Sequence, residues 1–235
     1  PVQFTPQEFV DTLSPITPRL YSISSSPKSH PREVHITVAV VKYNNFERDR
    51  FGLATGDLSN RIEVNKTRIP VYIQSTKEFV IPEDRSKNII MVGPGTGIAP
   101  FRAFLEQRIE KNGTGKNWLF FGDIHEKSTF FYKDEWFKAM KNGNLQKLTT
   151  AFSRDQEHKI YVQHRLLNNS KEIWEWLKAG AYFYVCGDKQ YMAKDVHSAL
   201  IEIAQKEGKL KKEDAKNYIN QTLMKDERRY LRDVY

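Results

Sequence analysis

The sequence is poor in cysteine, in long apolar runs and in paired histidines, and each shortage excludes a class of protein. A single cysteine, Cys186, cannot form an internal disulfide, which favours a reducing, cytoplasmic location. The longest apolar runs, such as 88–92 and 118–121, are far shorter than the ~20 residues that a membrane-spanning helix needs. The N-terminus has no basic segment followed by an apolar stretch, so no signal peptide is expected. The six histidines show no metal-ligand spacing, so no metal site is predicted.

Positive charge is in excess, because 37 Lys and Arg stand against 29 Asp and Glu and give a formal net charge of +8. A nucleic-acid partner, a site for an anionic cofactor or acidic partner, and a lysine-rich surface would each produce such an excess. The lysines are spread along the chain, and the one tight cluster, 209–212, lies beside acidic residues. We therefore expect neither a nucleic-acid partner nor a membrane partner.

Residues 1–82 have the character of antiparallel β structure. Three segments rich in β-branched residues predict strands, at 33–42, 68–74 and 78–81. Turn-forming residues precede or separate them, at 24–27, 30–31 and 44–45. Thr5-Pro6 is typical of a helix start, which predicts a short helix within 1–13.

From Asn88 onwards, predicted strands alternate with predicted helices. The strands are 88–92, 117–121, 148–152, 181–186 and 230–235. One helix begins near Ala99, and the others are 132–142, 172–179, 190–207 and 212–225. This alternation indicates a parallel sheet covered on both faces, which binds ligands at the carboxyl ends of its strands. A polar linker at 82–87 places the domain boundary after residue 82.

Gly93-Pro-Gly-Thr-Gly97 lies between a predicted strand and a predicted helix. A phosphate can approach the backbone closely only where side chains are absent, and a helix N-terminus adds partial positive charge. The spacing is G-x-G-x-G, and the window 108–116, where the common NAD fingerprint needs an acidic residue, holds only Glu110. The turn therefore predicts a phosphate site that is not of the NAD type, with an ordinary tight turn as the alternative.

Ser153-Arg154 and the nearby Lys159, Tyr161 and Gln163 follow the third predicted strand of this region. A hydroxyl, a guanidinium and an ammonium suit a 2′-phosphate, and a tyrosine ring can stack on adenine. An ordinary basic loop is the alternative.

Three further stretches carry chemistry. Cys186-Gly-Asp188 ends a predicted strand, where glycine admits a ligand, although most lone buried cysteines are inert packing. Arg19-Leu-Tyr-Ser22 offers a guanidinium for a pyrophosphate, an aromatic ring for stacking and a hydroxyl, with a surface strand as the alternative. The chain ends in Arg232-Asp-Val-Tyr235, with an aromatic residue closing a predicted strand.

In their order along the chain, these stretches resemble the FAD/NADPH half of the diflavin reductases, a ferredoxin-NADP reductase-like family. Within the family the likeness is greatest to the flavoprotein (alpha) subunits of bacterial NADPH-sulfite reductases, and it runs from about Ile16 to Tyr235. The matching segments are 19–22, 93–102, 117–123, 153–163, 184–195 and 228–235. The resemblance implies an α/β chain in which a doubly wound parallel-sheet NADP-binding domain, 83–235, follows a partial antiparallel β-barrel FAD-binding domain, 1–82.

The resemblance also implies an FAD site and an NADPH site. The positions implied for FAD are Arg19, Leu20, Tyr21, Ser22, Thr37, Val38, Ala39, Tyr43, Gly52, Leu53, Ala54 and Thr55. Among them, Tyr21 stacks on the isoalloxazine, Ser22 lies near its N5, and 52–55 is a loop around the pyrophosphate. The positions implied for NADPH are Gly95, Thr96, Gly97, Ser153, Arg154, Lys159, Tyr161, Gln163 and Asp195.

The implied catalytic residues are Ser22, Cys186, Asp233 and Tyr235. Cys186 and Asp233 flank the nicotinamide, while Tyr235 covers the flavin and moves aside. The implied reaction passes a hydride from NADPH to FAD, after which electrons go to FMN in a flavodoxin-like domain. From there they reach a hemoprotein beta subunit that reduces sulfite to sulfide.

The resemblance leaves the extent of the flavin half and the final acceptor open. The FMN domain, the first barrel strands and most of a helical connecting region would lie outside these 235 residues, with 1–15 as the tail of that region. One alternative is a fragment that binds NADP without activity, because its FAD lobe is incomplete. Another is a diflavin reductase that serves a different acceptor. Asp57 departs from the family's pattern, since its charge would repel a pyrophosphate unless it points away.

Overall fold

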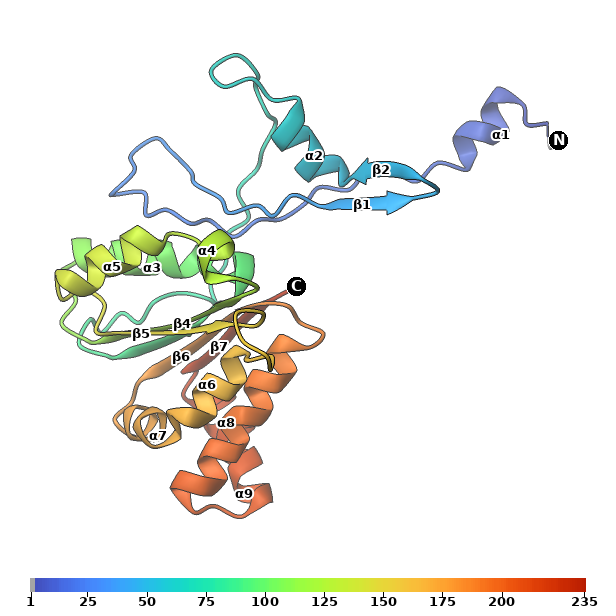
Figure 1. Cartoon of the computed structure of the whole chain (residues 1–235). Helices are drawn as coiled ribbons and strands as arrows, with labels where there is room; N and C mark the ends of the chain where they lie inside the picture. Colours follow the sequence, from blue (N-terminus) through green and yellow to red (C-terminus); the bar gives the residue numbers. More distant parts are fainter. Residues whose placement is uncertain (1–2) are drawn as a thin grey trace. The chain divides into compact units, whose positions relative to one another are not determined.

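The computed structural model describes residues 3–235 (Figure 1). The chain forms two compact units that interleave along the sequence. The first holds the residues up to Tyr21 together with Val40–Thr67, and the second holds Ser22–Ala39 together with Arg68–Tyr235.

The second unit is built on a five-stranded sheet in the order β5-β4-β3-β6-β7, with every neighbouring pair parallel. The strands are β3 (Ile89–Val92), β4 (Asn117–Asp123), β5 (Lys147–Phe152), β6 (Tyr182–Gly187) and β7 (Tyr230–Val234). The predicted parallel sheet is confirmed, and each strand starts within one residue of its predicted start. The chain runs outward from β3 to β5 and then crosses to β6, so the direction of winding changes between β3 and β6.

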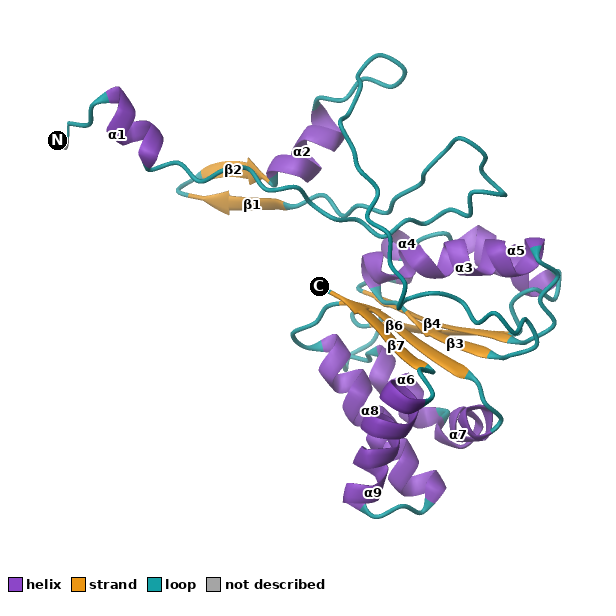
Figure 2. Cartoon of the chain, turned by 180° about the vertical axis from the view of Figure 1, so that it is seen from behind, coloured by secondary structure: helices purple, strands orange, loops and turns teal. Residues whose placement is uncertain are grey.

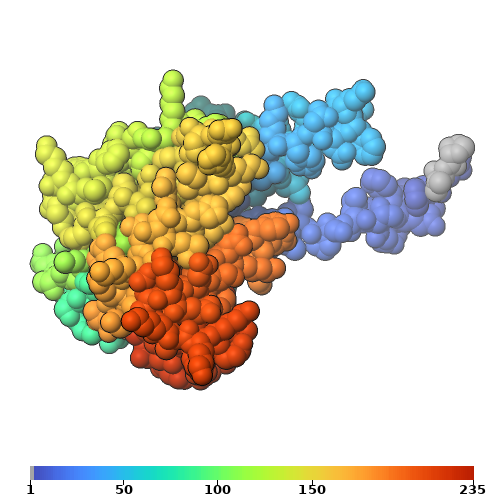
Figure 3. All heavy atoms as spheres, turned by 60° about the horizontal axis from the view of Figure 1, so that its bottom comes forward, coloured from blue at the N-terminus to red at the C-terminus, as the bar shows by residue number. Residues whose placement is uncertain are grey.

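Helices cover both faces of this sheet (Figures 1 and 2). One face carries α3 (Ala99–Glu110), α4 (Glu126–Thr129) and α5 (Lys133–Lys141). The other carries α6 (Val162–Asn168), α7 (Ser170–Lys178), α8 (Met192–Gly208), α9 (Lys212–Asn217) and the π-helical η2 (Tyr218–Asp226). Figure 3 shows α8 and α9, in orange and red, spread over that second face. Helices α4 and α6 were not predicted. Among residues 3–235, no helix is long and apolar enough to cross a membrane.

Alternate residues of the central strand feed two separate cores. Ile90 and Val92 belong to the core under α6, α7 and α8, while Ile89 and Met91 belong to the core under α3 and α5. All four side chains are fully buried. Because a strand that is buried on both faces has apolar residues at every position, the short run 88–92 was recognisable as a central strand.

The first unit contains α1 (Pro6–Asp11), the hairpin of β1 (Lys42–Asn45) and β2 (Arg48–Phe51), and α2 (Leu53–Asn60). The predicted N-terminal helix is confirmed as α1. The Glu8 N–H donates to Thr5 Oγ1 at 3.3 Å, and the Thr5 N–H donates to the Glu8 carboxylate at 2.8 Å. This reciprocal pair is a capping box, which fixes the start of the helix.

The three strand predictions between residues 33 and 81 are wrong. Within the described residues, 33–42 makes only an isolated bridge between Ile23 and Ile36 before β1 begins, and 68–74 and 78–81 form no strand. The predicted turn at 44–45 lies inside β1, and the chain turns at Phe46 and Glu47, which both have a positive φ. Val71 and Ile73 are 83% and 70% exposed, because β-branched residues form a strand only beside a strand that can pair with them. The antiparallel part of the fold is therefore a small two-stranded sheet, separate from the five-stranded parallel one.

Candidate functional site

The glycine turn lies at the carboxyl end of the central strand β3 and leads through the 3-10 helix η1 (Gly95–Ile98) into α3. A Cβ on Gly97 would lie 2.1 Å from the Cys186 carbonyl oxygen, and one on Gly93 would lie 2.5 Å from the Gly97 carbonyl oxygen. Gly95 has a φ of +56°, and its Cβ would meet only a carboxylate oxygen of Asp123, at 3.9 Å. Gly93 and Gly97 therefore close the turn against the sheet, while Gly95 leaves its outer side open to a ligand at a helix N-terminus.

Three of the four predicted catalytic residues meet where β6 and β7 end. Ser22 Oγ donates to Asp233 Oδ2 at 3.0 Å, and Cys186 Sγ donates to the same oxygen at 3.8 Å. Burial raises the pKa of the Cys186 thiol, and the neighbouring Asp233 carboxylate raises it further, so the thiol stays protonated at neutral pH. The Ser22 hydroxyl and the Cys186 thiol thus share one carboxylate oxygen of Asp233 as their acceptor.

The fourth, Tyr235, lies on the glycine turn. Its hydroxyl is 3.0 Å from Thr96 Oγ1, and its backbone N–H donates to the Gly187 carbonyl oxygen at 3.2 Å. The side chain is 63% exposed. Because the hydroxyl contact with Thr96 lies at the surface, the ring can move without disturbing the core.

The predicted basic stretch follows β5 at the same edge of the sheet. The Ser153 N–H donates to the Asp123 carbonyl oxygen at 2.8 Å, and the Arg154 N–H donates to the Ile124 carbonyl oxygen at 3.0 Å. The Arg154 and Lys159 side chains are exposed, so both cations can receive an anion from solvent.

Contacts at both ends hold this stretch in place. Asp155 accepts the Glu126 N–H at 2.7 Å and lies 2.8 Å from His125 Nδ1. The backbone hydrogen bond from Glu126, followed by the bond with His125, lowers the pKa of the Asp155 carboxyl. At the other end, Gln163 Nε2 donates to Asp195 Oδ2 at 3.0 Å. Two residues that were predicted separately therefore form one contact, between α6 and α8.

The predicted flavin-contacting residues are divided between the two units. Thr37, Val38 and Ala39 belong to the second unit together with Ser22, and Thr37 Oγ1 lies 2.7 Å from Tyr132 Oη. The others belong to the first unit: Arg19, Leu20, Tyr21, Tyr43, Gly52, Leu53, Ala54 and Thr55. Of the predicted flavin-contacting residues in the second unit, Ser22 is the one that donates to Asp233.

The segment 52–55 begins a helix and is not the predicted loop. Gly52 is the N-cap of α2, its N–H donates to the Val41 carbonyl oxygen at 2.9 Å, and Thr55 Oγ1 accepts the Val41 N–H at 3.1 Å. The Asp57 carboxylate lies 3.5 Å from the Arg61 guanidinium, one turn further along α2. Asp57 is therefore directed away from the helix N-terminus, whose N–H groups suit an anion.

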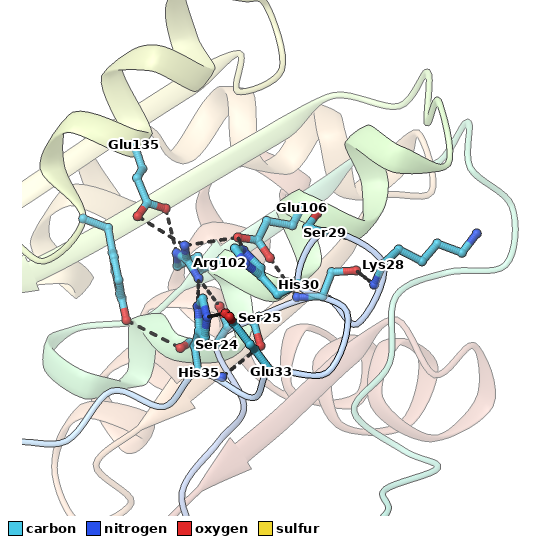
Figure 4. A network of polar contacts seen from close by, with 12 residues as sticks. Ser24, Ser25, Lys28, Ser29, His30, Glu33, His35, Arg102, Glu106 and Glu135 are labelled. Carbon is cyan, nitrogen blue, oxygen red and sulfur yellow. Dashed lines mark hydrogen bonds and ion pairs between the residues drawn. The ribbon is translucent and has the colours of Figure 1, made fainter. Parts of the chain in front are cut away.

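A polar network around Arg102 was not predicted (Figure 4). The buried guanidinium donates to Glu135 at 2.6 Å and to the Ser24 carbonyl oxygen at 2.8 Å, and it lies 3.2 Å from Glu106. Burial disfavours the charged form, but the pairing with Glu135 and Glu106 outweighs this and raises the pKa of Arg102. The network anchors the segment 22–39 to α3 and α5. One feature of the sequence could have indicated this network: Arg102 lies at the start of a helix, where the macrodipole disfavours a cation that has no anionic partner.

The sheet order places these groups in a row along one edge. The glycine turn after β3 is central, the exposed cations after β5 lie to one side, and the Cys186–Asp233 group at the ends of β6 and β7 lies to the other. A dinucleotide has the same layout, because its pyrophosphate separates a ribose-adenine half from a reactive ring. An exposed guanidinium and ammonium at that end are groups that suit a further phosphate on the adenine half.

Comparisons with known proteins agree with this layout. A family model described as the oxidoreductase NAD-binding domain matches residues 91–198, and one described as the FAD binding domain matches residues 1–56. The sulfite reductase [NADPH] flavoprotein alpha-component of Mannheimia succiniciproducens is 48% identical over 235 residues, which cover 100% of this chain and 39% of that protein. The corresponding protein of Vibrio parahaemolyticus is 48% identical over 233 residues, covering 99% and 37%, and that of Bacillus subtilis is 46% identical over 235 residues, covering 100% and 38%. The chain thus spans less than two fifths of the length of these relatives.

Proposed function

We propose that this chain, a relative of the sulfite reductase flavoprotein alpha-components along its whole length, binds NADPH and directs its hydride to FAD. The matches to an FAD binding domain and to an oxidoreductase NAD-binding domain support both cofactors. One observation carries the proposal: the strand order sets an open glycine turn between a cationic loop and a hydroxyl-carboxylate-thiol group.

In this proposal, each group along the carboxyl edge of the sheet binds a different part of NADPH. The residues Gly95, Thr96 and Gly97 would hold the pyrophosphate on backbone N–H groups at the start of η1. The 2′-phosphate would be bound by Ser153, Arg154 and Lys159, and the adenine would stack on Tyr161. The Gln163–Asp195 contact would fix α6 against α8 beside this loop.

The redox end of the site is formed by Ser22, Cys186 and Asp233. When bound, NADPH supplies a hydride and FAD accepts it. Asp233 holds both the Ser22 hydroxyl and the Cys186 thiol in place, and the protonated thiol presents a neutral, polarisable surface to an uncharged ring. Tyr235 would cover this place in the resting protein and has to move before a nicotinamide can enter.

For FAD, the residues present fit an anionic cofactor with a large ring. The N-terminus of α2, at Gly52, Leu53, Ala54 and Thr55, has no acidic residue in its first turn, and Asp57 is directed away from it. We propose that this end and Arg19 bind the pyrophosphate, and that Leu20, Tyr21, Thr37, Val38, Ala39 and Tyr43 contact the rest of FAD. In this assignment, the functional boundary between the FAD-binding and NADPH-binding parts lies between residues 82 and 83.

The partners follow from the proposed chemistry and the relatives' name. The name "alpha-component" indicates a second component in those proteins. We propose that this chain acts in the cytoplasm as part of a longer protein, in which an FMN-binding flavodoxin-like domain takes electrons from FAD. A hemoprotein beta subunit would then use them to reduce sulfite to sulfide.

The test is the coenzyme preference of the purified chain supplemented with FAD, with ferricyanide as the acceptor. NADPH should support reduction, and NADH should barely do so, because NADH has no 2′-phosphate for the cationic loop to bind. Arg154→Glu should raise the KM for NADPH about tenfold to a hundredfold, since one charge-assisted phosphate contact contributes ~1.5–3 kcal/mol. Lys178→Glu is the matched control, because Lys178 is an exposed cation at the end of α7 and the change in net charge is the same.

Equal rates with NADPH and NADH, or equal KM values for the two variants, would contradict the assignment of the 2′-phosphate. The flavin half is tested separately by the visible absorbance of the chain before and after FAD is added. If the chain takes up no FAD but still binds NADPH, the activity proposal fails and the chain is a nucleotide-binding module.

A further inference from the structure

The turn that joins Ser26 to Thr37 in the second unit brings three potential metal ligands together. One nitrogen each of His30 and His35 and one carboxylate oxygen of Glu33 lie within 4.8 Å of one another. The two imidazole rings lie close together, with centroids 4.2 Å apart and planes tilted by 49°, and Glu33 Oε2 is 3.0 Å from His35 Nε2 (Figure 4). Two imidazoles and a carboxylate are the ligand set that zinc uses when it keeps one position for water.

The surroundings of these ligands have an excess of negative charge. The network contains one permanently charged cation that pairs with carboxylates, Arg102. It contains four carboxylates, those of Glu33, Glu106, Glu110 and Glu135. The Lys28 ammonium extends away from them in Figure 4. The four carboxylates therefore outnumber the one guanidinium that pairs with them, and a divalent cation would restore much of the balance.

Glu106 already has the position of a supporting residue for a metal-bound His30. Its Oε1 lies 3.0 Å from His30 Nε2, which leaves Nδ1 of the same ring for another partner. Histidines that bind metals usually donate their other ring N–H to a carboxylate, which fixes the ring and strengthens the ligand. Glu106 is itself held by the Ser26 N–H at 2.7 Å, so the support is anchored to the backbone.

His35 contributes through an exchange of partners. Its Nδ1 lies 3.2 Å from Arg102, whose guanidinium can only donate, so Nε2 carries the proton that is shared with Glu33. A metal between His35 and Glu33 takes the place of that proton, which moves to Nδ1. Arg102 then gives up the contact with His35 and keeps its bonds with Glu135 and Ser24, at 2.6 and 2.8 Å.

We propose that His30, Glu33 and His35 bind one divalent cation of the zinc class, with Glu106 as the residue that orients His30. Ligand atoms about 2.0–2.2 Å from one tetrahedral Zn²⁺ lie about 3.4 Å from one another. Only small movements are needed from the present separations, which are 3.0 Å between Glu33 Oε2 and His35 Nε2 and at most 4.8 Å for any pair. The side chains of His30 and Glu33 are 26% and 66% exposed, which gives them freedom to make these movements. The imidazoles favour Zn²⁺ over Mg²⁺ and Ca²⁺, which prefer oxygen ligands. The bound metal would close the turn 30–35 against α3.

The experiment is zinc titration of the untagged 235-residue chain by calorimetry at pH 7.5, with Co²⁺ as a coloured substitute. We expect one Zn²⁺ per chain, four-coordinate Co²⁺ absorption, and no competition from millimolar Mg²⁺. His30→Gln combined with His35→Gln should weaken binding about a hundredfold or abolish it, and Glu106→Gln should weaken it about tenfold. His158→Gln, which changes an exposed histidine elsewhere, should bind zinc as the unmodified chain does.

Equal zinc binding by the double variant and the unmodified chain would overturn the proposal, as would six-coordinate Co²⁺ absorption. Circular dichroism of each variant separates loss of the site from loss of the fold. If the double variant does not fold, the Co²⁺ spectrum, the stoichiometry and the Mg²⁺ competition of the unmodified chain still decide the question. None of these readouts depends on NADPH or FAD.

Discussion

Replacing Gly97 with alanine tests how closely the glycine turn must approach β6. The added Cβ would lie 2.1 Å from the Cys186 carbonyl oxygen, whereas real Cβ atoms essentially never come within 3.0 Å of such an atom. The start of η1 must therefore move away from β6 by about 0.9 Å or more. Both sides of the contact are backbone, so no side chain can rotate to relieve it. Forced overpacking of this kind costs about 1–3 kcal/mol of unfolding free energy.

The same displacement should cost more in function than in stability. A shift of about 1 Å in a residue that positions substrate can reduce a rate about a hundredfold. We expect Gly97→Ala to lose about 1–3 kcal/mol in urea unfolding and to lower NADPH-dependent ferricyanide reduction by about a hundredfold. Gly143→Ala is the control, because Gly143 has a φ of +72° but no atom within 4 Å of its Cβ position. The Gly143→Ala variant should lose about 1–2 kcal/mol of unfolding free energy through backbone strain alone and keep its NADPH-dependent activity.

The reasoning about close approach would be refuted if Gly97→Ala unfolded like the unmodified chain and kept its NADPH-dependent rate. It would also be refuted if both alanine variants lost activity equally, since the second has strain without a clash.

Three further outcomes follow from contacts in the second unit. Asp233→Asn should lower kcat about tenfold with little change in the KM for NADPH, because it weakens the acceptor shared by Ser22 and Cys186, and an unchanged kcat in stopped-flow reduction would count against this role. Burial raises the pKa of the Cys186 thiol, so the folded chain keeps a proton that the unfolded chain loses near pH 9.0, and stability must fall as the pH rises above that value. Between pH 9 and 10, this fall in the free energy of unfolding should be smaller in Cys186→Ala, by up to about 1.4 kcal/mol per pH unit. If urea unfolding shows that the free energy of unfolding falls equally steeply with pH in both proteins, the effect is excluded. Arg102→Met should lose about 3 kcal/mol of unfolding free energy by leaving carboxylates such as Glu135 without their cation, and a loss below 1 kcal/mol would show that the network is replaceable.

The parallel sheet was predictable because its signals are local. Residues 89–92 form a short, wholly apolar run between a polar linker and a glycine turn, and such a run suits a strand with a core on each side. The site edge was predictable for the same reason, since the glycine turn, the basic stretch and Cys186 each follow a strand. Topology then brings the carboxyl ends of the strands together.

The strand predictions between residues 33 and 81 were wrong because β-branched content alone does not show that a pairing strand is present. The β-branched residues of 68–74 favour an extended conformation, but this segment forms a strand only if another strand pairs with it, and none does among the described residues. The Arg102 network was missed for a related reason. Its members Ser24, His35, Glu106 and Glu135 are distant in sequence, and only the folded second unit shows that they share one guanidinium.

The interleaving of the two units makes residues 40–67 an insertion within the second unit. Both ends of this stretch return to the same body, at Ala39 and at Arg68. For a flexible insert, the entropy of closing the loop grows only slowly with length, so that doubling it costs about 0.6 kcal/mol. The hairpin and α2 could therefore lengthen or shorten at little cost to the second unit. The segment 22–39 has no such freedom, because it carries both Ser22 and the partners of Arg102, so related chains should vary in length between residues 40 and 67 and keep the length of 22–39.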